Sequence, residues 1–416
     1  MKNLIFVLCV ISIILKILFN GVGFGGVSFW FYTVFLSGYC IFIFLSMHRK
    51  LGLNGRIKSL LVSLFIFLTY IILVFTANNL LFDIPYVMGL VMILIFIVSL
   101  YVSIDSFKKI KIMINTIIIC TFISALIAIG QYFDIGVVRS IHNMILVNKE
   151  TSFNSSRVSG MSPTVISFSY ELIIGITLLI YRTLTFNNNS VFKFVDIIFL
   201  LTMLLALVFN QTRSSLLVML VCIFLILIKG NKTKIRTVHL FNILIFFIGI
   251  GISLFILINY LDINNRFNSD TASASSRIPM LITAFNYSLE NPFGTGVYTP
   301  NITHIPSNTQ DSVISIILSN TPHNFLINLL VYYGYIGLLI ALFIMVFVWK
   351  SHKRNVRSGL INPELKRLSY CLTIIVFGFS LNGMTHNMGL FSIDIVIWTI
   401  ITMIFTISKF KICSKK

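Results

Sequence analysis

Long apolar runs alternate with short polar connections along almost the whole chain. A membrane-spanning α-helix needs about 20 predominantly apolar residues, and runs near this length recur from one terminus to the other. The runs are continuous and do not alternate with polar residues, which excludes the strands of a membrane β-barrel. The pattern predicts an all-α integral membrane protein with about twelve transmembrane helices. They are expected at residues 4–19, 27–47, 59–76, 84–104, 111–130, 164–181, 194–209, 214–228, 238–260, 323–349, 369–383 and 389–408.

The composition supports a membrane protein over a chain of soluble domains. Its 416 residues are 57% hydrophobic and only 10% charged, whereas a soluble domain carries about 25% charged residues. So little charge cannot cover a surface exposed to water. We therefore expect residues 1–416 to form a single polytopic membrane domain.

The net charge of +19 is explained by the position of the basic residues. Placing both termini in the cytoplasm puts most of the 31 Lys and Arg on the cytoplasmic side, as the positive-inside rule requires. Because the basic residues lie between apolar runs, the charge indicates membrane topology and not nucleic-acid binding. Lys16 falls inside the first span. The basic residues that fall on the outer side are Arg139, Lys149, Arg157, Arg213, Arg266 and Arg277.

Two outer connections are long enough to fold, residues 131–163 and the large loop 261–322 between the ninth and tenth predicted helices. Long ordered loops are often functional. Within the large loop, 276–289 is predicted to be a short amphipathic helix capped by Ser275 or Ser276. One apolar face would rest on the bilayer or on the helix bundle. That face contains Ile278, Leu281, Ile282, Phe285 and Leu289.

Arginines at the outer boundary are candidate anion ligands. Arg213 lies in the short polar connection 210–215, so it must sit at the membrane boundary. It could extend its charge to water there, or it could clamp a phosphate with two hydrogen bonds. Arg277 begins the helix of the large loop, where a cation opposes the helix dipole unless an anion compensates it; an ordinary surface arginine is the alternative. Arg157 is a third arginine on this side.

Histidines and a buried carboxylate are candidate acid–base groups. His-Asn pairs occur at 142–143, 323–324 and 386–387. His323 opens a helix, which favours neutral imidazole near pH 7 and suits a general base; a purely structural histidine is the alternative. Glu171 and Asp394 sit within predicted spans and are either functional or a structural pair. No Walker loop and no Cys/His spacing typical of a metal site occurs in the sequence.

Four motifs in this order resemble the superfamily of O-antigen ligases and Wzy-type O-antigen polymerases. Each is short, but their order and the large loop before the tenth helix also match. The resemblance covers about residues 150–345. The motifs are Arg157-Val158-Ser159-Gly160; Gln211-Thr212-Arg213-Ser214-Ser215-Leu216-Leu217; Ser276-Arg277 with Glu290-Asn291-Pro292-Phe293-Gly294-Thr295-Gly296; and Pro322-His323-Asn324-Phe325 with Gly334-Tyr335-Ile336-Gly337-Leu338-Leu339.

The resemblance implies a metal-independent, inverting glycosyltransferase that needs no cofactor. Its donor would be an oligosaccharide on undecaprenyl pyrophosphate, at the outer face of the cytoplasmic (inner) membrane. Arginines matching Arg213 and Arg277 would engage the pyrophosphate, and a histidine matching His323 would help to activate the acceptor hydroxyl. We further expect substrate contacts from Arg157, Asn324, Glu171 and His386. Membrane lipids are expected partners, a chain-length regulator is a further candidate, and nucleic acid is not expected.

The acceptor separates two related functions. A polymerase transfers the saccharide to another lipid-linked repeat unit, and this is the function we favour for the chain. A ligase transfers the finished polymer to the lipid A–core. A flippase or other transporter belongs to a different class, and it should show paired halves with intramembrane charges in both, which this sequence lacks.

Overall fold

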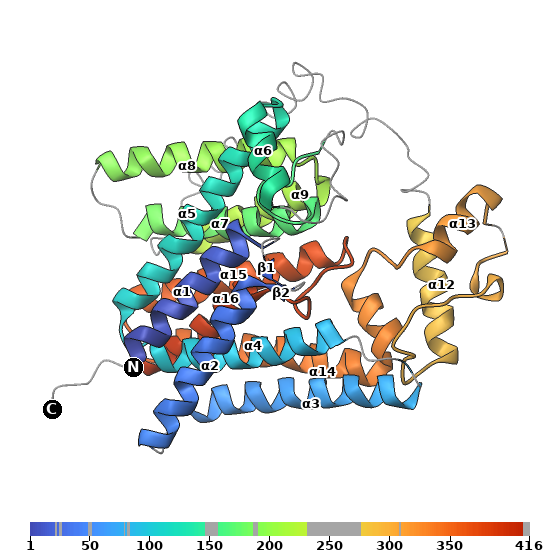
Figure 1. Ribbon diagram of the computed structural model, residues 1–416, viewed down its shortest axis with the longest axis horizontal. Coiled ribbons are helices and arrows are strands. Elements are labelled where there is room, and N and C mark those ends of the chain that lie inside the picture. Colours follow the sequence, from blue (N-terminus) through green and yellow to red (C-terminus); the bar gives the residue numbers. More distant parts are fainter. Residues whose placement is uncertain are drawn as a thin grey trace.

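Figure 1 shows a computed structural model of the chain, a bundle of long helices with a smaller helical region at one side. The structure describes residues 1–20, 23–24, 27–48, 52–78, 80, 84–145, 157–185, 190–230, 276–307 and 309–410. The helices of the first half are α1 (Lys2–Leu18), α2 (Phe29–His48), α3 (Gly55–Ala77), α4 (Ile84–Ser103), α5 (Phe107–Tyr132), α6 (Gly136–Ile145), α7 (Val165–Thr185), α8 (Ser190–Phe209) and α9 (Arg213–Gly230). Those of the second half are α12 (Arg277–Glu290), η1 (Ile302–His304), α13 (Asp311–Ser319), α14 (Phe325–Arg357), α15 (Pro363–Gly383), α16 (Ile395–Thr406) and η2 (Ile407–Lys409).

The all-helical membrane architecture predicted from the sequence is confirmed. Each predicted run forms a helix except the ninth, 238–260, which lies outside the described residues. The twelfth run, 389–408, becomes helical only at Ile395, so Asp394 caps α16 and does not lie within a span. Seven of the described helices are long and apolar enough to cross a membrane, namely α2, α3, α4, α5, α7, α8 and α14. The strands found among the described residues are one antiparallel pair of two residues each, β1 (Gly23–Phe24) and β2 (Val27–Ser28). The total of twelve spans stays a prediction.

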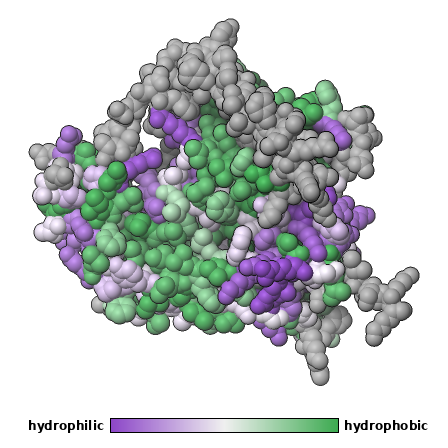
Figure 2. Space-filling view, turned by 180° about the vertical axis from the view of Figure 1, so that it is seen from behind, coloured by the Kyte–Doolittle hydropathy of each residue, from purple (hydrophilic) through white to green (hydrophobic). Residues whose placement is uncertain are grey.

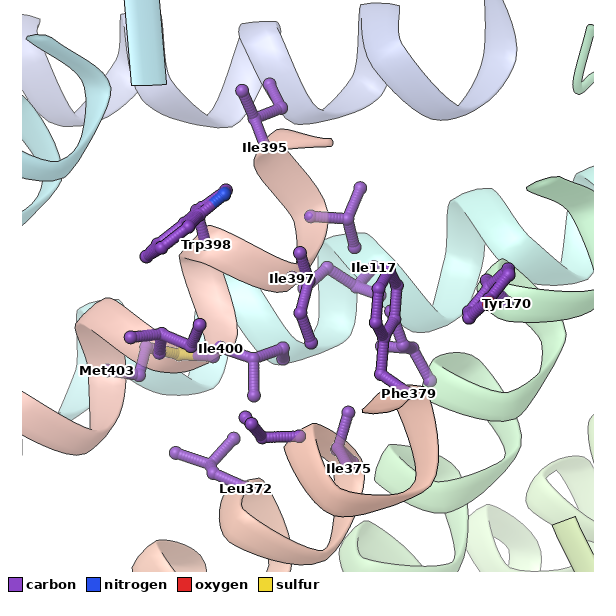
Figure 3. Close-up of a cluster of buried hydrophobic side chains, with 14 of the residues drawn as sticks. Ile117, Tyr170, Leu372, Ile375, Phe379, Ile395, Ile397, Trp398, Ile400 and Met403 are labelled. Atoms are coloured by element: carbon purple, nitrogen blue, oxygen red, sulfur yellow. The ribbon is translucent and has the colours of Figure 1, made fainter. Parts of the chain in front are cut away.

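The centre of the bundle is α16, whose twelve residues are all buried. A helix that is apolar on every side must be covered on every side, and α16 packs against α4, α14 and α15. Figure 3 shows Trp398, Ile400 and Met403 of α16 among Leu372, Ile375 and Phe379 of α15, with Ile117 of α5 and Tyr170 of α7 nearby. This core holds the connection between α15 and α16 in place.

Ends of helices that are distant in sequence meet at two opposite ends of the bundle. At one, called the basic end, Arg56 donates to Asn355 Oδ1 (3.2 Å), Lys111 pairs with Glu364 (3.3 Å) and Asn54 donates to Ser408. The other, called the α12 end, carries the end of α3, the start of α4 and the turns 157–165, 210–213 and 384–394, together with α12 and α13. Figure 2 shows a broad hydrophobic belt between hydrophilic margins, as expected for a bundle that crosses a bilayer.

The tenth predicted span differs from a single helix. Gly334 interrupts α14 with φ 64° and ψ −169°, dividing it into 325–333 and 335–357. The segment after α12 fills this break, because Gly296 N donates to Tyr332 O and Tyr335 N donates to Pro292 O, both at 2.9 Å. A Cβ on Gly334 would lie 2.3 Å from Pro292 O, and one on Gly294 (φ 78°) would lie 2.5 Å from Tyr332 O. Both glycines are therefore required by this close backbone contact.

The two long connections contain more helix than the sequence predicted. The helix predicted at 276–289 is confirmed as α12, but α13 and η1 were not predicted in the large loop, nor α6 within 131–163. Met280, Ala284 and Tyr287 of α12 are buried, with α13 and the start of α14 packed against them. The predicted apolar stripe is largely exposed, at Ile278, Ile282, Phe285 and Leu289, so it does not pack on the described part of the bundle; that it rests on the bilayer stays a prediction.

Candidate functional site

A tight turn between α8 and α9 presents Arg213 at the α12 end. Gln211 adopts the left-handed conformation (φ 54°), which is uncommon for a residue with a side chain. Asn210 is fully buried and donates to the carbonyls of Val158 and Val165, each at 2.9 Å. These bonds anchor the turn. Arg213 follows it as the first residue of α9, and its side chain is exposed.

The segment before α7 is fastened to the same turn by Arg157. Its guanidinium donates to Asn210 O (3.2 Å) and to Thr212 Oγ1 (2.8 Å). Gln131 of α5 holds the next residues, accepting from Ser159 N and Gly160 N and donating to Gly160 O at 2.8 Å. Two motifs separated by about fifty positions therefore form one hydrogen-bonded unit, in which Arg157 contacts the turn that carries Arg213.

The connection between α15 and α16 adds His386 to this unit. Its Nε2 lies 3.0 Å from Ser214 Oγ, in the first turn of α9. The ring of Tyr170 lies edge-on to it at 6.4 Å between centroids, and Tyr170 donates to Met388 O (2.7 Å). His386 is thus fixed in position by α7 and α9, and its backbone N–H donates to the carbonyl of Gly383 at the end of α15 (3.2 Å).

His323 and Arg277 lie close to His386. Burial lowers the pKa of His386 most, and the charges of His323, Arg277 and Arg157 lower it further, to about 4. Burial also lowers the pKa of His323, and Arg277 adds to that effect. Both imidazoles are consequently neutral near pH 7. We call Arg157, Arg277, His323 and His386 the His–Arg cluster.

The predicted neutrality of His323 holds, with a different main cause. The sequence argument relied on the positive end of a helix dipole. In the structure Asn324 is the N-cap, and its oxygen accepts from Leu326 N (3.0 Å) and Ile327 N (3.2 Å). His323 lies just before this cap, and burial is the first cause of its lowered pKa. Asn324, predicted to bind substrate, has its oxygen engaged in capping α14.

Glu171 belongs to a separate network inside the bundle. Its carboxylate accepts from Ser162 Oγ at 2.5 Å, and it is only 4% exposed. The charged groups acting on it are Asp394 and Lys16, and no arginine or histidine of the cluster is among them. Asp394 caps α16 by accepting from Val396 N (2.8 Å). These contacts are those expected of a structural carboxylate.

A cavity of about 610 Å³ adjoins the cluster. The outer turns of α3 and α4, the first segment of α14 and the connection 387–393 form its walls, and Gly296 and Val297 close it from the large loop. Thr321 and Phe325, two residues on either side of His323, line it, as does Asn387, the neighbour of His386. The cavity and the cluster therefore share their connecting segments.

The match to known proteins falls on this region. Residues 198–342 match the O-antigen ligase family. The segment runs from α8 into α14, so it contains Arg213, Arg277 and His323, whereas Arg157 and His386 lie outside it. The match confirms the superfamily resemblance drawn from the sequence motifs. No curated protein matches the chain.

Several residues of the site were missed by the sequence argument. Tyr170, which contacts His386, lies in a run interpreted only as a span, and Ser214, its other contact, was noted as part of a motif but given no role. Gln131, which holds the Arg157 segment, stood at the edge of a predicted loop. A polar residue within an apolar run is a signal that could have identified Asn328, which lines the cavity.

Proposed function

We propose that the protein polymerises oligosaccharide repeat units carried on undecaprenyl pyrophosphate, at the outer face of the cytoplasmic membrane. The observation that carries this proposal is the His–Arg cluster at the α12 end, of which Arg277 and His323 lie within the segment that matches the O-antigen ligase family. Members of that family are glycosyltransferase-like enzymes that act on lipid-linked saccharides. The α12 end would face outwards, with the active site at the level of the lipid head groups.

The donor pyrophosphate is assigned to arginines that begin helices. Arg213 is the first residue of α9 and Arg277 the first residue of α12, and both side chains are exposed. Each site joins a guanidinium to the backbone N–H groups of a helix amino terminus, a combination suited to phosphate. At Arg277, a bound pyrophosphate would also supply the anion that a cation at a helix amino terminus requires.

The reaction would be a displacement at the anomeric carbon of the donor sugar. A hydroxyl oxygen of the acceptor forms the new bond to that carbon from the side opposite the pyrophosphate, which inverts the configuration. The bond from carbon to pyrophosphate oxygen breaks, and the leaving group keeps the electron pair. His323, neutral and half-buried, accepts the hydroxyl proton, while Arg213 and Arg277 offset the charge on the leaving pyrophosphate. Arg157 and His386 hold the turns that position these groups.

Deletion of the gene in the native host, followed by gel analysis of surface lipopolysaccharide, tests the proposal. A polymerase mutant should show one repeat unit on the core. Bare core with lipid-linked polymer accumulating would instead mean ligase, the second candidate, which the name of the matched family favours. Unchanged ladders would contradict both functions.

Complementation then tests the arginine assignment. Arg213→Ala should restore about a tenth to a hundredth of the wild-type polymer, because a charge-assisted hydrogen bond contributes about 1.5–3 kcal/mol. Arg213→Lys should restore more, because it keeps the charge but loses the forked geometry. Wild-type ladders from Arg213→Ala at normal protein level would remove Arg213 from the site.

A further inference from the structure

The cavity beside the His–Arg cluster has features of a saccharide site. Its volume of about 610 Å³ lies within the range of small-molecule sites in proteins, about 300–1,000 Å³. Aromatic rings from several elements line it, among them Tyr86 of α4, Phe325 and Tyr333 of α14, and Phe391. A sugar ring presents a flat patch of C–H groups on one side and hydroxyl groups around its edge. Aromatic walls with a few polar groups match this distribution.

The aromatic wall is held in a fixed arrangement. The rings of Tyr86 and Tyr333 are stacked, with centroids 6.3 Å apart and an interplanar angle of 13°. The Tyr86 hydroxyl donates a hydrogen bond to Phe391 O (3.2 Å), which ties α4 to the connection before α16. A wall that is ordered before the ligand arrives loses less conformational entropy on binding.

Asn328 has a buried hydrogen-bond acceptor that a ligand in the cavity can use. The residue is 8% exposed and lines the cavity, and its Nδ2 donates weakly to Asn387 O at 3.5 Å. Its Oδ1 is buried and accepts no hydrogen bond from any described residue. Because a buried acceptor without a donor is unfavourable, native proteins rarely leave one unsatisfied. Because the Asn328 side chain lines the cavity, a rotation of its amide would present this acceptor to a hydroxyl group placed there.

We propose that this cavity binds a sugar ring of the acceptor substrate, with an acceptor hydroxyl donating to Asn328 Oδ1 and an apolar sugar face against the aromatic wall. The inference rests on the proposed function and names the site of its second substrate. Thr321 and Phe325 bracket His323 in sequence, so a saccharide in the cavity lies beside the base that would take its proton. A polyprenyl chain has no hydroxyl for Asn328, and its binding requires only apolar walls.

Binding of a soluble acceptor fragment tests the site separately from catalysis. The probe is the oligosaccharide released by mild acid from the host's own lipid-linked repeat unit, which lacks both lipid and pyrophosphate. Its Kd for the purified full-length protein is measured by calorimetry. Asn328→Leu and Tyr86→Leu should each weaken binding about tenfold or more. Tyr86→Phe keeps the ring and should bind within a factor of about three of wild type.

Tyr39→Leu serves as the matched control, because Tyr39 is exposed on α2 and does not line the cavity; it should leave Kd unchanged. Each variant is first shown to elute as a single species with the wild-type Tm.

Equal Kd values for wild type, Asn328→Leu and Tyr86→Leu, or no binding to wild type, would overturn the proposal. So would weakened binding of undecaprenyl phosphate, with saccharide binding intact, since that marks a lipid site. Intact saccharide binding that depends on Asn328, in a protein whose deletion leaves the ladders unchanged, would uphold the site and reject the polymerase function.

Discussion

His323 and His386 lie in the same cluster but are suited to different tasks. His386 is 8% exposed and its Nε2 is engaged with Ser214, so little of the ring can reach a substrate. His323 is half-buried, lies beside the cavity and is influenced by the exposed Arg277. A general base needs both a neutral ring and access to the hydroxyl. These contacts favour His323 as the base and His386 as a positioning residue.

The base assignment predicts a particular pH dependence. His323→Ala should abolish detectable polymer while the protein still inserts and binds the lipid-linked donor, since general-base catalysis contributes about 10²–10⁴-fold. In the wild type the pKa of His323 is lowered by burial and by Arg277, so the neutral base persists at pH 7 and is lost as pH falls through that pKa. Removing the charge in Arg277→Gln should raise the pKa and move the acid limb of the normalised rate profile to higher pH.

Lys353→Gln controls for a general effect of charge, because Lys353 is exposed at the opposite, basic end. Its pH profile should coincide with that of the wild type. Near wild-type polymerisation by purified His323→Ala would show that His323 is structural and leave His386 or Glu171 as the candidate base. An acid limb that stays in place in Arg277→Gln would separate Arg277 from His323.

Among the elements, the helix of the large loop is positioned by two glycines. Gly294 and Gly334 allow the segment after α12 to meet the break in α14 backbone to backbone. The same contact brings Gly296 and Val297 to the cavity and holds α12, whose first residue is Arg277. The glycine-containing parts of two motifs of the family resemblance thus join the loop to the bundle.

Gly334→Ala should weaken this joint. The backbone of Gly334 (φ 64°, ψ −169°) lies in a region adopted essentially only by glycine, where a residue with a side chain costs about 1–3 kcal/mol. The added Cβ would also meet Pro292 O at 2.3 Å. We expect a lower Tm in detergent, by a few degrees, together with reduced polymer. Gly359→Ala is the control, because a Cβ there meets no atom within 4 Å and its φ is not positive. Equal Tm values for the two variants would show that the joint does not stabilise the protein.

Local sequence patterns predicted the helices of this protein but not the contacts between distant segments. Spans were predictable because lipid requires long apolar helices with satisfied backbones, a demand visible within each segment. The break at Gly334 was not predictable, because the apolar run continues across it and the partner segment lies some forty residues earlier. The same limit applies to the site. Arg213, Arg277 and His323 were selected by residue type and position, whereas Ser214, Gln131 and Asn328 derive their roles from contacts between distant helices.

At the scale of the whole molecule, the distribution of charge agrees with the arrangement of helix ends. Segments assigned to the cytoplasm by the positive-inside rule come from separate loops, and the structure brings them together at the basic end. Arg56 contacts Asn355, Lys111 contacts Glu364, and Lys409 bonds to the carbonyl of Tyr101. Of the arginines assigned to the outer side, Arg157, Arg213 and Arg277 have described side chains, and they lie at the α12 end with the candidate site. If the predicted alternation of inside and outside connections were wrong, basic residues assigned to opposite sides would lie at the same end of the bundle.

Cysteine labelling of intact cells tests which end faces the cytoplasm. Ser307, exposed in the large loop, and Ser358, which follows α14 at the basic end, are replaced singly by cysteine after the six native cysteines are removed. Ser307→Cys should react with a membrane-impermeant maleimide before lysis, and Ser358→Cys only after permeabilisation. The expected asymmetry follows from the positive-inside rule, because Arg354, Arg357, Lys366 and Arg367 flank Ser358 and would be retained in the cytoplasm. Labelling of Ser358→Cys in intact cells would invert the topology and place the His–Arg cluster on the cytoplasmic side, where the proposed polymerisation could not take place.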